Sequence, residues 1–171
     1  MPTEKKQEFW LRGSLPGIIP PLQPVAHALL QAGEEISNEM YLFPEALLWE
    51  MPAGVASVGF HLLHIAGVVD RLATYAKGQP LSDIQLNYLK NEGINAGQTS
   101  NDLLQNLTNR LDIFVKELHS ISKEEIFELR GVGKAQLPST MFGLLVHAAE
   151  HTMRHTGQLL VTARILKAGN E

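Results

Sequence analysis

The chain has 171 residues, of which 44% are hydrophobic and 19% are charged, a composition typical of one globular domain and not of a disordered chain. Its net charge of −4 and the lack of a basic cluster argue against nucleic acid as a partner. No cysteine is present, which excludes disulfides, thiolate zinc sites and cysteine nucleophiles, so any metal ion would be held by imidazole or oxygen ligands.

The N-terminal segment is expected to be an extended arm and not a targeting signal. Residues 1–23 carry several prolines and glycines, which deny the backbone regular hydrogen bonding. The segment leads into no apolar run of the kind found in signal peptides. No stretch of the chain approaches the ~18 apolar residues that cross a bilayer. We therefore expect a cytoplasmic protein without a membrane partner.

Two long helices and one short helix are predicted in the first half of the chain. The first should begin near Pro24, where the missing N–H does no harm, and end before Pro44. The second is capped by Ser57 and closed by Gly78, a residue suited to the left-handed position after a helix. A short helix is expected from residue 82 to about residue 90.

Two further long helices follow after a glycine-containing break. One opens at Ser100, and its leucines recur at three- and four-residue steps as far as Leu118. Residues 119–138 form the longest connection, with only a weak alternation at 126–130. The last helix starts at Ser139 or Thr140 and runs to about Lys167. We therefore predict an all-α fold, a four-helix bundle with a proline-rich N-terminal arm, as one domain spanning residues 1–171.

Five of the seven histidines fall in the second and last long helices. His151 and His155 are four residues apart, so both rings project from one helix face. That face continues in apolar residues at three- and four-residue steps and should point into the core. His61 and His64 lie on a comparable apolar stripe of the second helix.

Several imidazoles that point into one apolar interior need partners, because unpaired buried polar groups are costly. A divalent cation satisfies them together, since neutral imidazole is a good ligand for zinc, nickel, copper and iron. A single core histidine is usually only hydrogen-bonded, but a helical pair joined by a histidine from another helix favours a metal site. His27 and His119 lack such neighbours and are interpreted as surface or capping residues.

The last helix offers a second pairing. His147 and His155 are separated by about 12 Å of helix rise, so His151 pairs with one of them and not with both. Residues 147–151 match H-x-x-E-H, the inverted zinc-peptidase signature with Glu150 as base. This match of five residues is weak, and so short a chain lacks the peptidase domain that the motif requires.

These two histidine segments resemble the DinB-like superfamily, which consists of bacterial metal-binding four-helix bundles. The resembling stretches are residues 57–67 with 70–72, and residues 150–158, where His151-x-x-x-His155 is followed by Thr156-Gly157-Gln158. The resemblance implies a three-histidine metal site made by His64, His151 and His155. It implies nickel or zinc as the ion, and His61 as a further ligand or a proton carrier behind the ligands. Members frequently form dimers, so it also implies a homodimer.

The resemblance further implies a function, because some relatives are transferases or isomerases that act with low-molecular-weight thiols. Our leading hypothesis is a metal-dependent enzyme of this type with a small-molecule substrate. His61 is then the candidate for proton transfer, and Glu150 or Gln158 could orient the ligands. The second hypothesis is a non-catalytic metal-binding bundle, a carrier or sensor. In a third hypothesis, the histidines bind no metal and form hydrogen bonds only to one another and to water.

Overall fold

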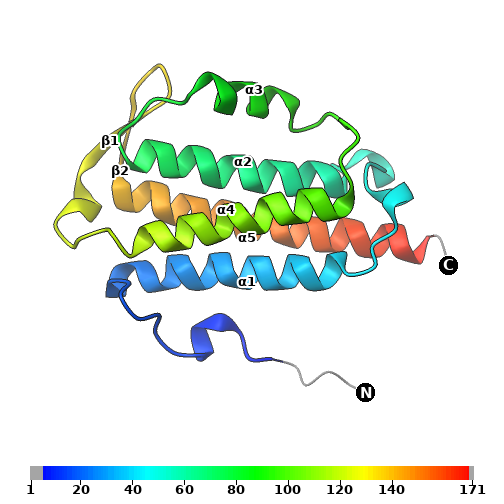
Figure 1. Cartoon of the computed structure of the whole chain (residues 1–171), viewed down its shortest axis with the longest axis horizontal. Helices are drawn as coiled ribbons and strands as arrows, with labels where there is room; N and C mark the ends of the chain where they lie inside the picture. The colour runs from blue at the N-terminus through cyan, green and yellow to red at the C-terminus, as the bar shows by residue number, and fades with distance from the viewer. Residues whose placement is uncertain (1–5, 170–171) are drawn as a thin grey trace.

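The computed structural model describes residues 6–169, and these are mostly helical. Four long helices lie side by side (Figure 1): α1 (Gln23–Met40), α2 (Val58–Ala76), α4 (Ser100–Leu118) and α5 (Met141–Ala168). A short helix, α3 (Asp83–Asn91), lies on the outer side of α2. Two short strands, β1 (Leu129–Val132) and β2 (Leu137–Thr140), form an antiparallel hairpin directly before α5.

Side-chain caps fix where the helices begin. The hydroxyl of Ser57 accepts the backbone N–H of Phe60 at 3.1 Å, which confirms the predicted start of α2. Thr140 caps α5 in the same way, 3.0 Å from the nitrogen of Gly143. The cap of α4 is Thr99, one residue before the predicted start. Each cap satisfies an N–H group that has no partner within its helix.

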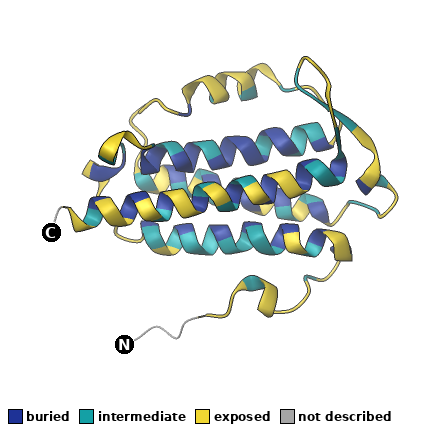
Figure 2. Ribbon diagram, turned by 180° about the vertical axis from the view of Figure 1, so that it is seen from behind, coloured by how far each residue is buried: buried dark blue, intermediate teal, exposed yellow. Residues whose placement is uncertain are grey.

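The core lies between the four long helices, whose inward faces are buried; α4 and α5 carry exposed residues on their outward faces, whereas α1 and α2 are mostly buried or half-buried (Figure 2). The predicted leucine repeat of α4 is confirmed, because Leu103, Leu107 and Leu111 are all at most 4% exposed. Helix α2 is buried on most of its surface. The segment Pro52–Ala76 is in fact long and apolar enough to cross a membrane, with a mean hydropathy of 1.5, which corrects our expectation. Because 61% of that apolar window is buried inside the protein, α2 has the character of a core helix.

The hairpin corrects the expectation of a purely α-helical chain. It begins in the connection predicted for residues 119–138 and continues to Thr140, directly before α5, with Leu129 paired to Thr140 and Val132 to Leu137. The turn uses Gly133 in the left-handed region, at a φ of 67°, a conformation that glycine adopts without strain. The strands are only four residues long, too short to give a clear alternation in the sequence.

The N-terminal arm is less extended than predicted. Its described part contains two short 3₁₀ turns, Phe9–Leu11 and Pro20–Leu22. Leu22 is fully buried and packs into the core. Arg12 also ties the arm to α1 through two hydrogen bonds to Glu34, of 2.8 and 2.9 Å. The prediction for residues 1–5 lies outside the described residues.

Candidate metal centre

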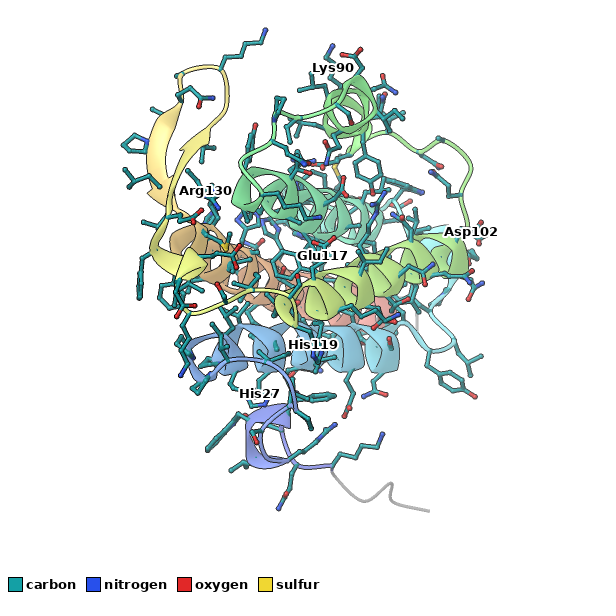
Figure 3. The ribbon with its side chains drawn as sticks, turned by 60° about the vertical axis from the view of Figure 1, so that its left-hand side comes forward. His27, Lys90, Asp102, Glu117, His119 and Arg130 are labelled. Carbon is teal, nitrogen blue, oxygen red and sulfur yellow. The ribbon has the colours of Figure 1, made fainter. Side chains whose placement is uncertain are left out.

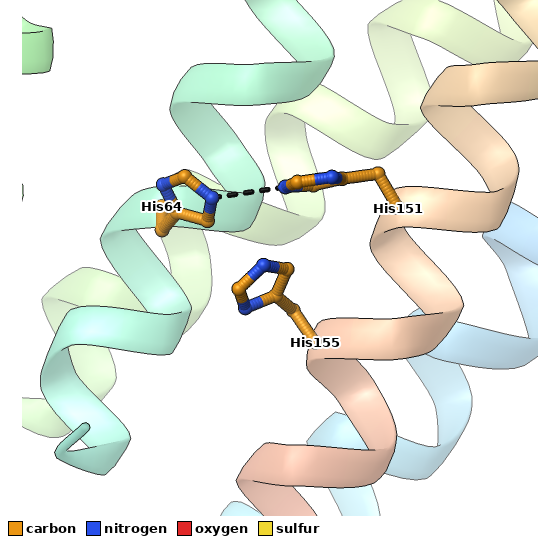
Figure 4. A group of neighbouring side chains, drawn as sticks. All are labelled: His64, His151 and His155. Atoms are coloured by element: carbon orange, nitrogen blue, oxygen red, sulfur yellow. Dashed lines mark hydrogen bonds between the residues drawn. The ribbon is translucent and has the colours of Figure 1, made fainter. Parts of the chain in front are cut away.

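Helices α2 and α5 bring together the three histidines that the sequence singled out (Figure 4). His64 comes from α2, and His151 and His155 come from α5. Each offers a ring nitrogen, and these three atoms all lie within 4.8 Å of one another. Nε2 of His64 is 2.9 Å from Nε2 of His151. The His155 ring centre is 4.5 Å from both other ring centres. The geometry is that of a group able to hold one cation.

The helical repeat explains this convergence. The four-residue spacing of His151 and His155 puts both rings on the face of α5 that is turned toward α2. On α2, Phe60 lies one turn before His64 and stacks on its ring, with a centroid separation of 5.1 Å and an interplanar angle of 13°. This stacking restricts the orientations that the His64 ring can adopt.

The rings of the α5 pair are neutral near pH 7. Burial, followed by the charges on His155 and His64, lowers the pKa of His151 to about 4. Burial, followed by the charge on His64, also lowers the pKa of His155. A neutral imidazole carries one proton on two nitrogens, so each ring keeps a lone pair that can bind a metal ion.

His61 lies behind His155 and outside the group of three. Its Nδ1 is 3.0 Å from Nδ1 of His155, which leaves Nε2 of His155 as the nitrogen directed toward the other two rings in Figure 4. His61 is 3% exposed. Burial, with the charges of His155 and His64, lowers its pKa to about 4. A neutral His61 can accept the Nδ1–H of His155, so the structure favours a supporting contact over direct ligation.

Glu92, at the C-terminal cap of α3, also contacts the group, and our sequence analysis missed it. Its Oε2 is 2.7 Å from Nδ1 of His64. The residues that we expected to orient the ligands are placed elsewhere: the carboxylate of Glu150 pairs with Arg154, and Gln158 is exposed. No sequence signal marks Glu92, because it follows a short polar helix and belongs to no apolar repeat.

The remaining histidines lie outside the group. The His147 ring centre is 5.4 Å from that of His151, but its side chain is 52% exposed and the nitrogens that converge are those of His64, His151 and His155. His27 and His119 lie on the side of α1 and the N-terminal arm (Figure 3). Nε2 of His27 is 3.1 Å from the carbonyl oxygen of Gly13, and His119 is the C-terminal cap of α4. Both are surface or capping residues, as predicted.

The donor set fits a divalent cation. Nε2 of His64 and Nε2 of His151 face each other at 2.9 Å, and a cation can accept both lone pairs where a hydrogen bond uses only one. Nδ1 of His151 is buried without a hydrogen-bond partner among the described residues, so no acceptor behind this ring fixes its tautomer. Three imidazole nitrogens suit zinc, nickel, copper or iron better than calcium or magnesium.

Comparison with known proteins agrees with this geometry. Residues 26–159 match the model of the DinB superfamily. The crystal structure of a protein from Streptococcus pneumoniae is similar, with a TM-score of 0.63 and 15% sequence identity, over 86% of this chain and 90% of the other. At that identity the likeness extends to the fold alone. Among curated proteins the comparison found no match. The resemblance noted in the sequence is confirmed, and the chain belongs to the DinB superfamily.

Proposed function

We propose that the protein binds one divalent metal ion through His64, His151 and His155, and that it is an enzyme of the thiol-transferase or isomerase type. The observation that carries this proposal is the convergence of three imidazoles from two helices, with nitrogens within 4.8 Å of one another, in a superfamily known for metal binding. Three protein ligands leave coordination positions open to water or substrate, as in catalytic zinc sites.

The surroundings of the three rings support chemistry at that position. A bound zinc or nickel ion would lower the pKa of a coordinated thiol or water and so supply a nucleophile near neutral pH. His61 can accept a hydrogen bond from Nδ1–H of His155, which leaves the Nε2 lone pair of His155 free. The His64 side chain is 18% exposed, which leaves a route for a small molecule. We propose a low-molecular-weight thiol as co-substrate, and a cytoplasmic homodimer as the working form.

A non-catalytic carrier or sensor is the second candidate. It uses the same three ligands and needs no access for a substrate, which the 18% exposure of the His64 side chain limits to small molecules. A carrier should bind and release metal without turning over any thiol or electrophile. The two candidates therefore differ in the chemistry after metal binding and not in the ligands.

Titration of metal-free protein with zinc or nickel tests the site itself. We expect one ion per chain, and loss of that binding in His151→Ala and in His155→Ala with helix content unchanged in circular dichroism. The matched control is His147→Ala on the same helix, whose side chain is 52% exposed and lies outside the group. Metal binding that persists in both His151→Ala and His155→Ala would overturn the proposed site.

Cobalt-substituted protein separates the two candidate functions. Cobalt shows intense sulfur-to-metal absorption when a thiolate binds, so we expect new bands on adding small thiols, followed by turnover of an electrophile in the same sample. If a thiol series leaves the cobalt spectrum unchanged, the thiol chemistry is wrong. Bound metal with no turnover across thiols and electrophiles would favour the carrier.

A further inference from the structure

A buried carboxylate joins helix α3 to the histidine group. Glu92 is 4% exposed, which is unusual for an ionised side chain unless it is paired. Both of its oxygens are in use: Oε2 is 2.7 Å from Nδ1 of His64, and Oε1 accepts a hydrogen bond of 2.5 Å from Nη1 of Arg71. Because both oxygens are engaged, Glu92 contacts the Nδ1 side of the His64 ring and is not part of the group of three converging nitrogens.

Helix α2 is shaped to receive this carboxylate. His64, Gly67 and Arg71 follow one another at three- and four-residue steps, so they lie on one face of the helix. A Cβ atom at Gly67 would overlap the Glu92 carboxylate and would lie 2.6 Å from Nη1 of Arg71. The missing side chain at Gly67 therefore creates the space in which Glu92 reaches both partners.

Polar contacts, together with the half-buried Tyr88 ring that packs against the core, hold α3 in place. None of its residues is buried. The Gln85 side chain donates to the Asp70 carboxylate at 2.8 Å and to the Thr74 hydroxyl at 2.7 Å, and the Tyr88 hydroxyl donates to the carbonyl of Leu63 at 3.1 Å. These hydrogen bonds hold α3 against α2 and so place Glu92 within hydrogen-bonding distance of His64.

We infer that Glu92 is a positioning residue that fixes the tautomer and orientation of His64, an inference that rests on the proposed metal site. A carboxylate only accepts hydrogen bonds, so it requires the proton of His64 to be on Nδ1. The lone pair is then on Nε2, the atom that faces His151. Arg71 holds the carboxylate in place. Carboxylates behind histidine ligands act in this way in metal sites, where their loss costs about 10–100-fold in metal affinity.

Glu92→Gln gives a sharp test because an amide has one acceptor and one donor end. Arg71 can only donate, so the amide oxygen turns toward Arg71 and the amide NH₂ faces His64. The NH₂ group then stabilises a lone pair on Nδ1 and moves the His64 proton to Nε2. Adding Arg71→Met frees the amide oxygen to accept from Nδ1–H again. The double variant should therefore restore the original tautomer.

The experiment measures the tautomer and the metal affinity separately. Ring ¹⁵N shifts of His64 in metal-free protein should show the proton on Nδ1 in the wild type and in Glu92→Gln/Arg71→Met, and on Nε2 in Glu92→Gln. Zinc affinity, from competition with a chelator, should fall by about 10–100-fold in Glu92→Gln and recover in the double variant. Glu117→Gln is the control, because Glu117 on α4 pairs with Lys77, the C-terminal cap of α2, and is not part of the histidine group; it should leave both readouts unchanged.

The outcomes distinguish this inference from the proposed function. Glu92→Gln with an unchanged His64 tautomer and unchanged zinc affinity would overturn the positioning role. A wild-type protein that binds no metal would overturn the proposed function, while the ¹⁵N shifts would still decide which nitrogen Glu92 selects. Circular dichroism shows whether Glu92→Gln folds. If it does not, the test uses the double variant Glu92→Gln/Arg71→Met, in which a His64 proton on Nε2 would contradict the inference.

Discussion

The metal-free protein should lose stability on mild acidification because of His61. This ring is 3% exposed, and burial together with the charges of His155 and His64 lowers its pKa from 6.5 to about 4. Between those two pH values the unfolded chain binds a proton at residue 61 that the folded protein does not bind. The free energy of unfolding therefore falls as the pH falls through this interval, and it levels off below about pH 4.

The size of the effect follows from the same interval. A difference of one pH unit between folded and unfolded pKa values corresponds to about 1.4 kcal/mol. The interval from 6.5 to about 4 then gives at most about 3.5 kcal/mol for His61. His151, whose pKa is also lowered to about 4, acts in the same direction. Its ring is partly exposed, so its share is smaller.

Urea unfolding of chelator-treated protein at a series of pH values from 7.5 to 4 measures this loss of stability. The same series on the His61→Gln variant gives the comparison. The glutamine side chain can still accept the Nδ1–H of His155 but does not titrate. We expect the wild type to lose stability with acid more steeply than the variant, by up to about 1.4 kcal/mol per pH unit. Carboxylates titrate alike in both proteins and cancel in the difference. Parallel curves for the two proteins would refute the reasoning.

Three further substitutions test the fold and the support of the site. Leu107→Ala, at a fully buried position of α4, should lower the free energy of unfolding by about 2–5 kcal/mol in urea titrations. Ser57→Ala removes the cap of α2 and should cost about 1 kcal/mol in the same assay; no loss would mean that another group satisfies the Phe60 N–H. Gly67→Ala places a Cβ where the Glu92 carboxylate lies, so zinc affinity should fall although alanine favours the helix by about 1 kcal/mol. An unaltered affinity would show that Glu92 can move without harm to the site.

The parts of the structure that were predictable from sequence are those that repeat along a helix. The leucines of α4 and the histidine-bearing stripe of α5 recur at three- and four-residue steps, and that spacing determines which side chains share a face. The three candidate ligands lie on such faces, so the sequence identified them. Side-chain caps such as Ser57 are also local, because donor and acceptor lie within one turn of each other.

The parts that escaped prediction leave no periodic signal in the sequence. The hairpin is formed by two four-residue strands whose pairing gives no periodic signal. Glu92 lies 28 residues from His64, at the end of a helix without buried residues. Only the space above Gly67 and the position of Arg71 show why a carboxylate is buried there. No composition or spacing rule connects these three residues before the fold is known.

The three candidate ligands are not equally prepared for a cation. Glu92 accepts from Nδ1 of His64, and His61 can accept from Nδ1 of His155, so both rings can keep an Nε2 lone pair directed inward. Nδ1 of His151 is buried without a partner among the described residues. With the Nε2 lone pair of His64 directed at it, this ring can satisfy itself by donating Nε2–H to His64. Binding of a cation at Nε2 of His151 would require that proton to be on Nδ1, where an unpaired buried N–H would cost about 1–3 kcal/mol. Of the three candidate ligands, His151 is therefore the one whose coordination costs the most free energy. A hydrogen-bond acceptor placed beside its Nδ1 would raise the metal affinity more than one placed beside either other ring.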